Sequence, residues 1–376
     1  MNILFIVPSY KPAHVYGGPI VVVALLAETL AQMGHVVTVY TTTANGQTEL
    51  EVPVNSEIMV DGVRVIYFHR VTGDHTHASP ALWQYLGKTV KTFDVVHLHS
   101  WWNALILGAA WISKRHNVTP VLSPHGMFSD YVITTNNSVK KQLLHKLIGK
   151  QLLCNTRLHV STVLEWEESR KVVPDWQGAI IPNPVILSQT NYAPPNNPVF
   201  TIGFLSRIEA KKGLDVLIRA LSKVNFAYRL LIAGDGKPSY IQSLKELAAI
   251  SGNTNKLEWV GWKKGEDKFA FLASIDLFAL TSHSENFAVV VIEALSMGTS
   301  VLISNKVGLH NFVSEYDYGW VTDMNVESIT QQLNKLAADH TKAFHIRASA
   351  PAAIRNEYES TALAQQYVNF YQSTAQ

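Results

Sequence analysis

The chain has 376 residues, of which 47% are hydrophobic and 16% are charged. This length and composition predict two or more globular domains, each large enough to bury a core of its own. The formal net charge is only +2 and no dense run of Lys and Arg occurs, so the sequence gives no sign of a nucleic-acid partner.

The first residues, MNILFIVPSYKP, contain a six-residue apolar run with no basic segment before it. This pattern predicts a buried first strand rather than a signal peptide. No window reaches 18 consecutive apolar residues, so no membrane-spanning helix is expected. The single Cys154 excludes an internal disulfide and a cysteine-based zinc site, and it suits a reducing compartment. Together these features favour a cytoplasmic location.

In the first half of the chain, short apolar runs alternate with helical patterns such as 20–33 and 103–116. The expected strands are NILFIV (2–7), HVVTVYT (35–41), GVRVIYFH (62–69), DVVHLHS (94–100), TPVLSPH (119–125), RLHVS (157–161) and GAIIP (178–182). Apolar strands that alternate with helices predict a parallel sheet covered on both faces.

The alternation stops at SQTNYAPPNNP (188–198), which is rich in Pro and Asn and is interpreted as a linker. It then resumes, and helices are expected at 327–339 and in the tail at 354–372. The second set of strands is VFTIGFLS (199–206), YRLLIAGDG (228–236), KLEWVGW (256–262), DLFALTS (276–282), TSVLIS (299–304) and GWVTD (319–323). The chain is therefore expected to form an α/β domain at 1–187, a linker at 188–198, a second α/β domain at 199–355 and a C-terminal helix at 356–376. Two such doubly wound domains bind ligands at the carboxyl ends of their strands.

The stretch SENFAVVVIEALSMG carries two carboxylates between two of the expected strands. A helix is expected to begin near Asn286, with Ser284 or Asn286 as its N-cap, and to stop at Gly298. Glu285 would then lie beside the free N–H groups of the helix start. Glu293 lies about two turns further along an otherwise apolar helix, where a carboxylate is costly without a partner. Such a site could hold a polyhydroxylated, phosphorylated ligand.

Two other strand ends in the second half carry candidate residues. Arg207 and Lys212 follow the first strand and suit a diphosphate, as a bidentate cation and a point charge. The alternative is a solvated basic loop in which Glu209 is the counterion. Gly234 and Asp235 follow a later strand, where a glycine lets a nucleotide lie close to the backbone; the Asp could equally form the turn.

The first half offers weaker candidates. Gly17 and Gly18 precede the first helix and could bring backbone N–H groups to an anion, or simply form a tight turn. They are not part of a GxGxxG pattern, so dinucleotide binding is not supported. His125 ends a strand and could donate to a hydroxyl or a phosphate, whereas most of the other histidines are expected to be structural. Trp101 and Trp102 could face a sugar, but packing is the favoured interpretation.

Residues 138–157 carry basic side chains with leucines between them, and no acidic residue occurs from 131 to 164. The basic residues are Lys140, Lys141, Lys146, Lys150 and Arg157. This segment could rest on an anionic membrane surface. However, Lys140 and Lys150 fall on the leucine side of a helical wheel, so a helix packed on the sheet is the favoured alternative.

Taken together, these motifs resemble glycosyltransferase family 4, the retaining transferases of the GT-B fold. The resemblance covers nearly the whole chain and is strongest from Thr201 to Ser304. Its most specific element is the E-x7-E spacing of Glu285 and Glu293. The segments GFLSRIEAKKGLD, LLIAGDG, GGP and SPHGM match the family pattern in the same order.

The resemblance implies two Rossmann-like doubly wound domains that face each other across a cleft, with the C-terminal helix crossing back to the first domain. It implies a nucleotide-diphosphate sugar as donor and a glycan or lipid-linked acceptor. By this resemblance Arg207 and Lys212 clamp the donor diphosphate, aided by the backbone of Gly17 and Gly18. Glu285 holds hydroxyls of the donor sugar. The other implied contacts are the N–H groups of Phe287 and Ala288 near the phosphate, Glu293 on the ribose, and His125 on the sugar.

The family resemblance also implies catalysis without a metal, and the sequence has no DxD motif. Two departures concern the selection of the sugar. The first carboxylate is followed by Asn286, Phe287 and Ala288, where the family often has Gly-Phe-Gly, and the later Gly-Gly-x-Pro-Glu is replaced by 307–311. The sequence leaves two alternatives open, a non-hydrolysing sugar-nucleotide epimerase and a non-catalytic sugar-nucleotide-binding protein.

Overall fold

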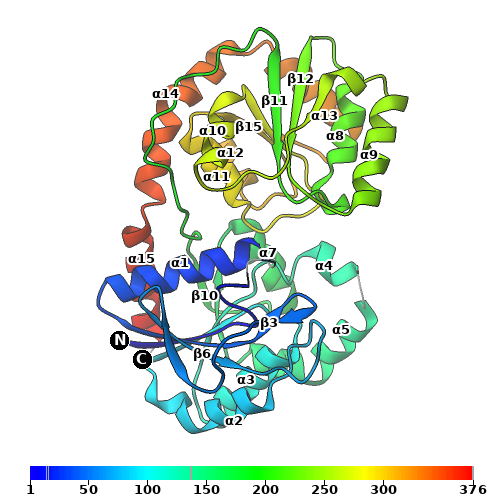
Figure 1. Cartoon of the computed structure of the whole chain (residues 1–376). Helices are drawn as coiled ribbons and strands as arrows, with labels where there is room; N and C mark the ends of the chain where they lie inside the picture. Colours follow the sequence, from blue (N-terminus) through cyan, green and yellow to red (C-terminus); the bar gives the residue numbers. More distant parts are fainter. Residues whose placement is uncertain (14, 16, 136–137, 375–376) are drawn as a thin grey trace. The chain divides into compact units, whose positions relative to one another are not determined.

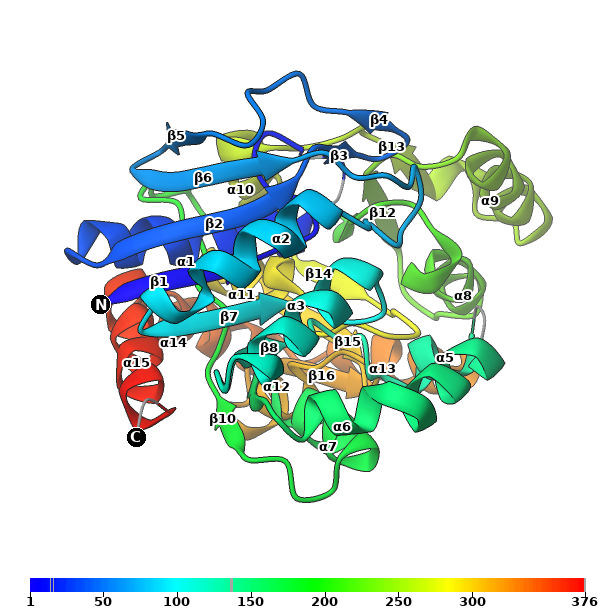
Figure 2. The same cartoon turned by 90° about the horizontal axis from the view of Figure 1, so that it is seen from below.

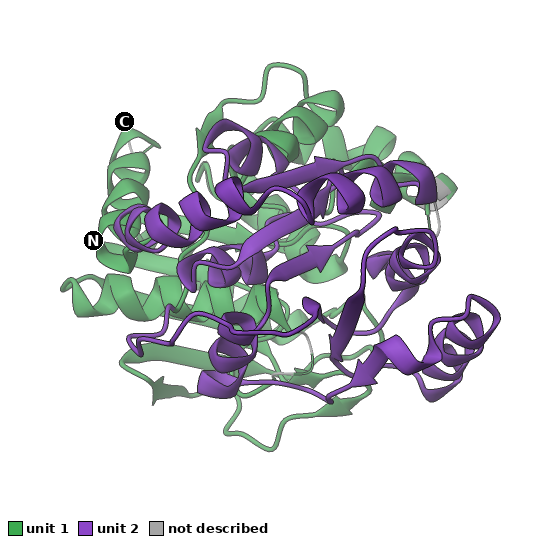
Figure 3. Ribbon diagram, turned by 90° about the horizontal axis from the view of Figure 1, so that it is seen from above, with its two compact units in different colours: residues 1–186, 358–376 green, residues 187–357 purple. Residues whose placement is uncertain are grey.

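The structure is a computed structural model that describes residues 1–13, 15, 17–135 and 138–374. The chain forms two compact units (Figure 3). Unit 1 comprises Met1–Ile186 and Tyr358–Gln376, and unit 2 comprises Leu187–Glu357. The C-terminal helix therefore belongs to the first unit, as the resemblance implied.

Unit 1 is built on an eight-stranded sheet with the order β10-β9-β8-β7-β1-β2-β6-β5. Every neighbouring pair in it is parallel except β5 and β6. Figure 2 shows β6, β2, β1, β7 and β8 side by side in this order. The strands are β1 (Asn2–Ile6), β2 (Val36–Thr42), β5 (Glu57–Val60), β6 (Val63–Phe68), β7 (Val95–His99), β8 (Val121–Ser123), β9 (Arg157–Val160) and β10 (Gly178–Ile180). A separate hairpin pairs β3 (Ala44–Asn45) with β4 (Thr48–Glu49). The strands β3, β4 and β5 were not predicted from the sequence.

Helices cover both faces of the unit 1 sheet (Figure 1). The helices of the unit are α1 (Gly18–Gln32), α2 (Pro80–Thr89), α3 (Ala104–Arg115), α4 (Asp130–Thr134), α5 (Ser138–Leu144), α6 (Lys150–Leu153), α7 (Val163–Val172) and α15 (Ser360–Thr374), together with the short turns η2 (Val90–Thr92) and η3 (His145–Gly149). In β1, Ile3 and Phe5 pack in the core under α1 and α15, whereas Leu4 and Ile6 pack in the core under α2 and α3. This alternation follows from the two-residue period of a strand, and it explains why a strand buried on both faces is wholly apolar.

Unit 2 contains a six-stranded, fully parallel sheet with the order β13-β12-β11-β14-β15-β16. The strands are β11 (Phe200–Leu205), β12 (Tyr228–Ala233), β13 (Leu257–Trp259), β14 (Leu277–Leu280), β15 (Ser300–Ser304) and β16 (Gly319–Thr322). The helices α8, α9 and α13 lie on one face and α10, α11 and α12 on the other (Figure 1). Their bounds are α8 (Leu214–Leu221), α9 (Pro238–Ile250), α10 (Gly265–Ser274), α11 (Val289–Ser296), α12 (His310–Glu315), α13 (Val326–Leu336) and α14 (His340–Glu357), with the 3-10 turns η4 (Ala210–Lys212) and η5 (Thr254–Lys256).

Each sheet has one point at which the strand order reverses. In unit 1 the central β1 lies between β2 and β7, and in unit 2 β11 lies between β12 and β14. The loops that follow the two strands on either side of such a point leave in opposite directions, which opens a crevice at the carboxyl ends. Most of the candidate residues lie in the loops after β1, β8, β11, β12 and β14, whereas Gly18 is the first residue of α1 and Glu293 lies inside α11.

The segment 188–198 contains no helix or strand, as expected for a linker, but it is attached to unit 2. The hydroxyls of Ser188 and Tyr192 both donate to the carboxylate of Glu266, each at 2.7 Å. The single helix expected at 354–372 is instead two helices, because α14 ends at Glu357 and α15 begins at Ser360. Within the described ranges, no helix combines the length and the apolar character that crossing a membrane requires.

The basic segment of unit 1 forms α5, the π-helical turn η3 and α6. Its last two leucines, Leu152 and Leu153, are buried, but Val139, Leu143 and Leu147 are 76%, 57% and 69% exposed. The favoured prediction of a helix packed on the sheet is therefore wrong for the first part of this segment. The four-residue spacing of these three side chains places them along one side of the helix, where they form an exposed apolar stripe.

Candidate functional site

The loop after β11 carries the two cations that the sequence analysis singled out. Arg207 is 55% exposed and its guanidinium lies 2.8 Å from the carboxylate of Glu209, which is the local ion pair considered from the sequence. Lys212 closes the η4 turn, and its side chain is only 13% exposed. The two cations therefore differ in character, because Arg207 is solvated whereas Lys212 is enclosed.

Glycine at position 213 fixes the end of this loop. Its φ is +64°, a conformation that side chains rarely adopt, and a Cβ there would lie 1.8 Å from the carbonyl oxygen of Thr281. The Thr281 hydroxyl in turn donates to the Gly213 carbonyl at 3.1 Å. Since Thr281 directly follows β14, this close approach ties the Lys212 loop to the neighbouring strand end.

Gly234 and Gly236, which follow β12, are also required by a close approach to another stretch of backbone. A Cβ at Gly234 would lie 2.1 Å from the carbonyl oxygen of Ser206, and one at Gly236 would lie 2.2 Å from that of Ile208. These glycines therefore let the β12 loop pack on the backbone of the Arg207 loop. Asp235 accepts a hydrogen bond from the N–H of Gly236 at 2.8 Å, which is the turn-forming alternative.

Glu285 faces Lys212 across the carboxyl ends of β11 and β14. The Lys212 Nζ lies 2.5 Å from Glu285 Oε1, and the Glu285 side chain is 14% exposed. The backbone of Glu285 bridges to the loop after β15, because its N–H donates to Lys306 O at 3.0 Å and its carbonyl accepts from Gly308 N–H at 2.9 Å. The tertiary structure thus brings together a cation and a carboxylate that lie 73 residues apart in the chain.

The helix that follows Glu285 is α11, and the prediction that it begins near Asn286 is wrong. The helix α11 begins at Val289 rather than near Asn286, and its N-cap is Ala288, whose φ of 60° and ψ of 66° are left-handed. Glu285 therefore lies four residues before the helix and not at its positive end. The N–H groups of the first turn belong to Val289 and Val290, after the Phe287 and Ala288 that the resemblance indicated. The helix ends at Ser296, just before the predicted stop at Gly298.

Glu293, a buried carboxylate that needs a partner to offset the cost of burial, has a cationic one. It is 4% exposed on α11, and its carboxylate forms an ion pair with Lys268 of α10. Burial raises the pKa of Glu293, whereas the charge of Lys268 and its hydrogen bond act in the opposite direction. Lys268 was not predicted as this partner, because it lies 25 residues from Glu293 and no local pattern in the sequence indicates the pairing.

Lys211, next to Lys212, was also missed. Burial lowers the pKa of its ammonium group, and the neighbouring charges of Lys212 and Arg207 lower it further, while Glu285 raises it. Three basic side chains therefore share the short loop between β11 and α8. The signal that could have found Lys211 is its adjacency to Lys212 in the run AKKG.

In unit 1 the paired glycines lie at the start of α1. Gly17 is its N-cap with a φ of 73°, Gly18 is its first residue, and Pro19 follows in the first turn. Among residues 1–13, 15, 17–135 and 138–374, no side chain caps this helix start, and its first turn contains no acidic residue. A Cβ at either glycine would meet no atom of the described residues within 4 Å, whereas the φ of Gly17 is one that residues with a side chain rarely adopt.

His125 lies in a tight turn after β8. Its φ of 51° and the φ of 77° at Gly126 make two consecutive left-handed residues. The Nε2 of His125 lies 3.1 Å from Nδ1 of His99, and the two rings stack with centroids 5.4 Å apart. Desolvation lowers the pKa of His125 to about 4, so the ring is neutral at physiological pH.

Three further histidines lie behind His125 in the core, which confirms their structural interpretation. The Ser123 hydroxyl contacts both His97 Nε2 and His159 Nδ1, each at 2.6 Å. The other nitrogen of His97 lies 2.8 Å from the Tyr371 hydroxyl of α15. Burial is the largest cause that lowers the pKa of all three, to about 3 for His159 and well below the ordinary value for His97 and His99.

The two tryptophans after β7 are structural. Trp101 is fully buried, as the packing interpretation predicted. Trp102 donates from its indole nitrogen to Met127 O at 2.7 Å and so holds the loop that contains His125. Asn103 caps α3 by accepting from the N–H of Ile106 at 2.9 Å.

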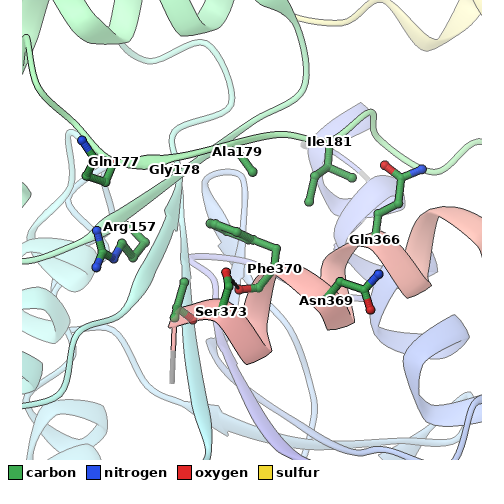
Figure 4. Close-up of a pocket in the computed structure, with 10 residues that line it drawn as sticks. Arg157, Gln177, Gly178, Ala179, Ile181, Gln366, Asn369, Phe370 and Ser373 are labelled. Carbon is green, nitrogen blue, oxygen red and sulfur yellow. Dashed lines mark hydrogen bonds between the residues drawn. The ribbon is translucent and has the colours of Figure 1, made fainter. Parts of the chain in front are cut away.

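A pocket of about 610 Å³ lies in unit 1 between α15 and the edge of the sheet. Figure 4 shows Arg157, Gln366 and Phe370 among its lining residues. Its lining runs from Arg157, the first residue of β9, along the edge strand β10 to Ile181. It includes none of the candidate residues and is not part of the candidate site.

Within the described part of the chain, no group of three or more His, Cys, Asp or Glu side chains is arranged to hold a metal ion. The charged groups at the carboxyl ends of β11 and β14 are instead organic cations paired with carboxylates. In chemical terms this arrangement can neutralise an anionic ligand through Arg and Lys and can accept hydrogen bonds from hydroxyls through Glu285.

Comparison with protein families gives two adjoining matches. Residues 16–189 match the model described as Glycosyltransferase Family 4, and residues 191–352 match the model described as Glycosyl transferases group 1. The two matches meet inside the segment that was interpreted as a linker.

Individual relatives are distant. An uncharacterized glycosyltransferase of Methanocaldococcus jannaschii is 28% identical over 171 residues, which span 45% of this chain and 43% of the archaeal protein. A D-inositol 3-phosphate glycosyltransferase of Corynebacterium urealyticum is 24% identical and matches over 95% of this chain and 91% of its own length. The crystal structure of Anabaena HepE in complex with UDP superposes with a TM-score of 0.76 at 19% identity and covers 99% of this chain and 100% of that one.

Proposed function

Because the chain belongs to glycosyltransferase family 4 and has the GT-B fold, we propose that it is a retaining glycosyltransferase that uses a nucleotide-diphosphate sugar. One observation carries this proposal. Lys212 and Glu285 form an ion pair at the carboxyl ends of β11 and β14, and Arg207 lies in the same loop as Lys212, beside the strand-order reversal of unit 2. A parallel α/β sheet binds its ligands at that position.

In this proposal Arg207 and Lys212 neutralise the donor diphosphate. A guanidinium can meet two phosphate oxygens at once, and an enclosed ammonium offers a strong point charge. Both cations have carboxylate partners, Glu209 and Glu285, which the diphosphate would have to displace or share. Breaking the exposed ion pair between Arg207 and Glu209 costs little, because an exposed ion pair contributes less than about 1 kcal/mol to stability.

The carboxylates would select hydroxyl groups. Glu285 would accept from hydroxyls of the donor sugar, since it lies beside the cations that hold the adjoining phosphate. Glu293 would accept from the ribose, although in the structure its carboxylate is buried and paired with Lys268. Gly17, Gly18, Gly234 and Asp235 would contribute backbone contacts to the donor. The N–H groups that start α11 would face the phosphate.

We propose uridine diphosphate as the nucleotide and a glycan or lipid-linked sugar as the acceptor in the synthesis of cell-surface polysaccharide. The support for UDP is the similarity in fold to HepE, whose structure contains UDP. Thermal shift tests the nucleotide directly, because a ligand that binds only the native state raises its melting temperature. UDP should stabilise the protein more than GDP, ADP or CDP at equal concentration, and a larger effect of another diphosphate would replace UDP in the proposal.

For the chemical step we propose attack by the acceptor hydroxyl on the face from which the diphosphate departs, with the leaving phosphate oxygen taking the proton. The bond from the anomeric carbon to phosphate breaks and the new glycosidic bond forms with retention. His125 would contact the sugar as a neutral ring, and the cations would stabilise the departing charge. No metal enters this scheme, so excess EDTA should leave the rate unchanged; a requirement for added Mg²⁺ would refute this part.

Activity assays test the site. Arg207→Ala and Lys212→Ala should each lower kcat/KM at least 100-fold, since each removes charge stabilisation in the transition state. Arg229→Ala and Lys223→Ala are matched controls, because both side chains form exposed ion pairs elsewhere in unit 2, with Glu258 and Glu327. Unchanged turnover in the first two variants would refute the assignment. Incubation of donor without acceptor excludes an epimerase if the donor sugar is recovered unaltered.

We also propose that the protein works in the cytoplasm, with the exposed stripe of Val139, Leu143 and Leu147 resting on an anionic membrane. Lys146 and Lys150 are also exposed on this segment, and lysines beside inserted apolar side chains favour anionic lipid. Sedimentation with phosphatidylglycerol vesicles should exceed that with phosphatidylcholine. Leu143→Glu/Leu147→Glu should abolish the difference, whereas Ile250→Glu, at an exposed position of α9, should not. Equal sedimentation with both lipids would refute the contact.

A further inference from the structure

Glu165 of α7 is a buried carboxylate to which the sequence analysis gave no role. It is only 3% exposed, and its two oxygens contact two different loops. Oε1 accepts from the N–H of Gly126 at 2.6 Å. Oε2 accepts from the N–H of Ser161 at 2.9 Å and from its hydroxyl at 3.2 Å. One side chain thus connects the loop after β8 to the loop after β9.

The contact with Gly126 falls on the turn that orients His125. The left-handed backbone at His125 is rare for a residue with a side chain, and it persists only where the surroundings hold it. A hydrogen bond from a backbone N–H to a buried carboxylate is of the charge-assisted kind, which is shorter and stronger than one between neutral groups. Glu165 therefore supplies a strong fixed acceptor directly beside the strained residue.

Glu165 is itself held in place by the start of its helix. Thr162 is the N-cap of α7, and its hydroxyl accepts from the N–H of Glu165 at 3.1 Å. The sequence Thr-x-x-Glu is the pattern of a capping box, in which the third helical residue is anchored. A helix of ten residues packed beside β9 thereby provides a rigid base for the turn after β8.

We propose that Glu165 is a positioning residue that sets the orientation of the His125 imidazole for sugar transfer. This inference rests on the proposed function for its catalytic consequence, but its structural part is independent of that function. On this view Glu165 touches neither donor nor acceptor and acts only through the Gly126 turn. His99 also holds the imidazole of His125, because the two rings stack and His99 Nδ1 contacts His125 Nε2.

The test compares Glu165→Gln with Glu168→Gln. The amide keeps the size of the side chain but directs an N–H group at either Gly126 N–H or Ser161 N–H. Glu168 is a matched control, because it lies on the same helix and accepts from the N–H of Asp130, the first residue of α4, at 3.1 Å. The first readout is the imidazole ¹⁵N and ¹H signals of His125 in the full-length protein, assigned with His125→Ala. Glu165→Gln should shift them, and Glu168→Gln should leave them at the wild-type positions.

The second readout is kinetic. Glu165→Gln should lower kcat at least tenfold while the Kd for UDP stays within twofold, because Arg207 and Lys212, the cations proposed to hold the diphosphate, lie in unit 2 and not in the turn that Glu165 contacts. Residues that act as a unit are non-additive, so Glu165→Gln should cause no further loss of kcat in a His125→Ala background. An equal loss in both backgrounds, or unshifted His125 signals, would overturn the inference.

The outcomes separate this inference from the proposed function. If Glu165→Gln shifts the His125 signals but His125→Ala transfers sugar at the wild-type rate, the positioning role stands and the role of His125 in transfer falls. If Glu165→Gln does not fold, Glu165→Asp serves in its place, because it keeps the charge and withdraws the carboxylate from Gly126. The same shift in the His125 signals is then expected, and its absence would equally overturn the inference.

Discussion

Lys212 and Glu285 form an enclosed ion pair, with Nζ 2.5 Å from Oε1 and side-chain exposures of 13% and 14%. The pair joins the loop after β11 to the loop after β14, which are adjacent strands in the sheet of unit 2. Neither side chain can be removed without leaving the other charge in a partly desolvated place. The same two residues are proposed to bind the diphosphate and the sugar, so stability and activity are coupled here.

Substitutions at Lys212 and Glu285 can separate the contribution of this ion pair to stability from its contribution to activity. Lys212→Ala should lower the free energy of unfolding of unit 2 by about 1–3 kcal/mol, because it leaves a partly buried carboxylate without its cation. Lys212→Ala/Glu285→Gln should recover most of this loss and yet remain inactive. Urea denaturation and transfer assays measure the two effects. The control Lys223→Ala should cost less than about 1 kcal/mol, since its ion pair with Glu327 is exposed. Recovery of activity in the double variant would contradict the proposed role of both side chains.

The buried ion pair of Lys268 and Glu293 predicts that the stability of a Lys268→Met variant depends on pH. Burial raises the folded-state pKa of Glu293, so its protonated form favours folding, and stability is lost as pH rises from the ordinary carboxyl pKa through the raised one. Lys268 opposes this loss. Lys268→Met should therefore destabilise unit 2 little at pH 4.5 and by about 2–3 kcal/mol at pH 7.5.

Glu293→Gln supplies the control for that result, because it removes the charge and keeps the size. In Lys268→Met/Glu293→Gln, unit 2 should unfold at nearly the same urea concentration at both pH values. A Lys268→Met variant that is equally destabilised at pH 4.5 and pH 7.5 would show that lost packing, and not the carboxylate charge, causes the effect.

The buried histidines predict acid sensitivity of unit 1. Burial lowers the pKa of His125 to about 4 and of His159 to about 3, and it lowers those of His97 and His99 in the same direction. The unfolded chain binds protons at these groups near pH 6.5, so stability is full above that pH and falls between about 6.5 and 4. Each proton taken up on unfolding contributes about 1.4 kcal/mol per pH unit.

The measurement is the free energy of unfolding of unit 1 between pH 7.5 and pH 5, followed by the fluorescence of its tryptophans. A slope steeper than about 1.4 kcal/mol per pH unit near pH 5.5 requires more than one histidine to take up a proton. A flat profile over this range would show that the four rings are already accessible to protons in the folded protein.

Ala288 predicts a stabilising substitution. It is the N-cap of α11 in a left-handed conformation that is costly for a residue with a Cβ, and the family pattern often has glycine there. Ala288→Gly should therefore raise the stability of unit 2 by about 1 kcal/mol. Ala352→Gly, at an exposed position inside α14, should lower it by a similar amount and so controls for chain entropy. Destabilisation by both substitutions would show that the Ala288 methyl group contributes packing that outweighs the strain.

How much of this site the sequence could predict depends on the range of each interaction. The strands that precede Arg207 and Glu285 are local apolar runs, and they were predicted with nearly the bounds that the structure has, whereas the strand before His125 was predicted at 119–125 and covers only Val121–Ser123. The start of α11 was misplaced because Ser284 and Asn286 are good caps by local preference. The backbone of Glu285 instead pairs with Lys306 and Gly308. Long-range backbone pairing overrode the local signal.

The sequence by itself determined the two parallel α/β units and the family, because hydrophobic period and short motifs are properties of neighbouring residues. Only the tertiary structure decided the partners: Lys212 with Glu285, Lys268 with Glu293, and Glu165 with the Gly126 turn. The physical reason is that a charge in a sequence has many possible partners. In the folded chain, the strand order and the close approach of backbones at glycines bring only one of these possible partners within reach of each charge.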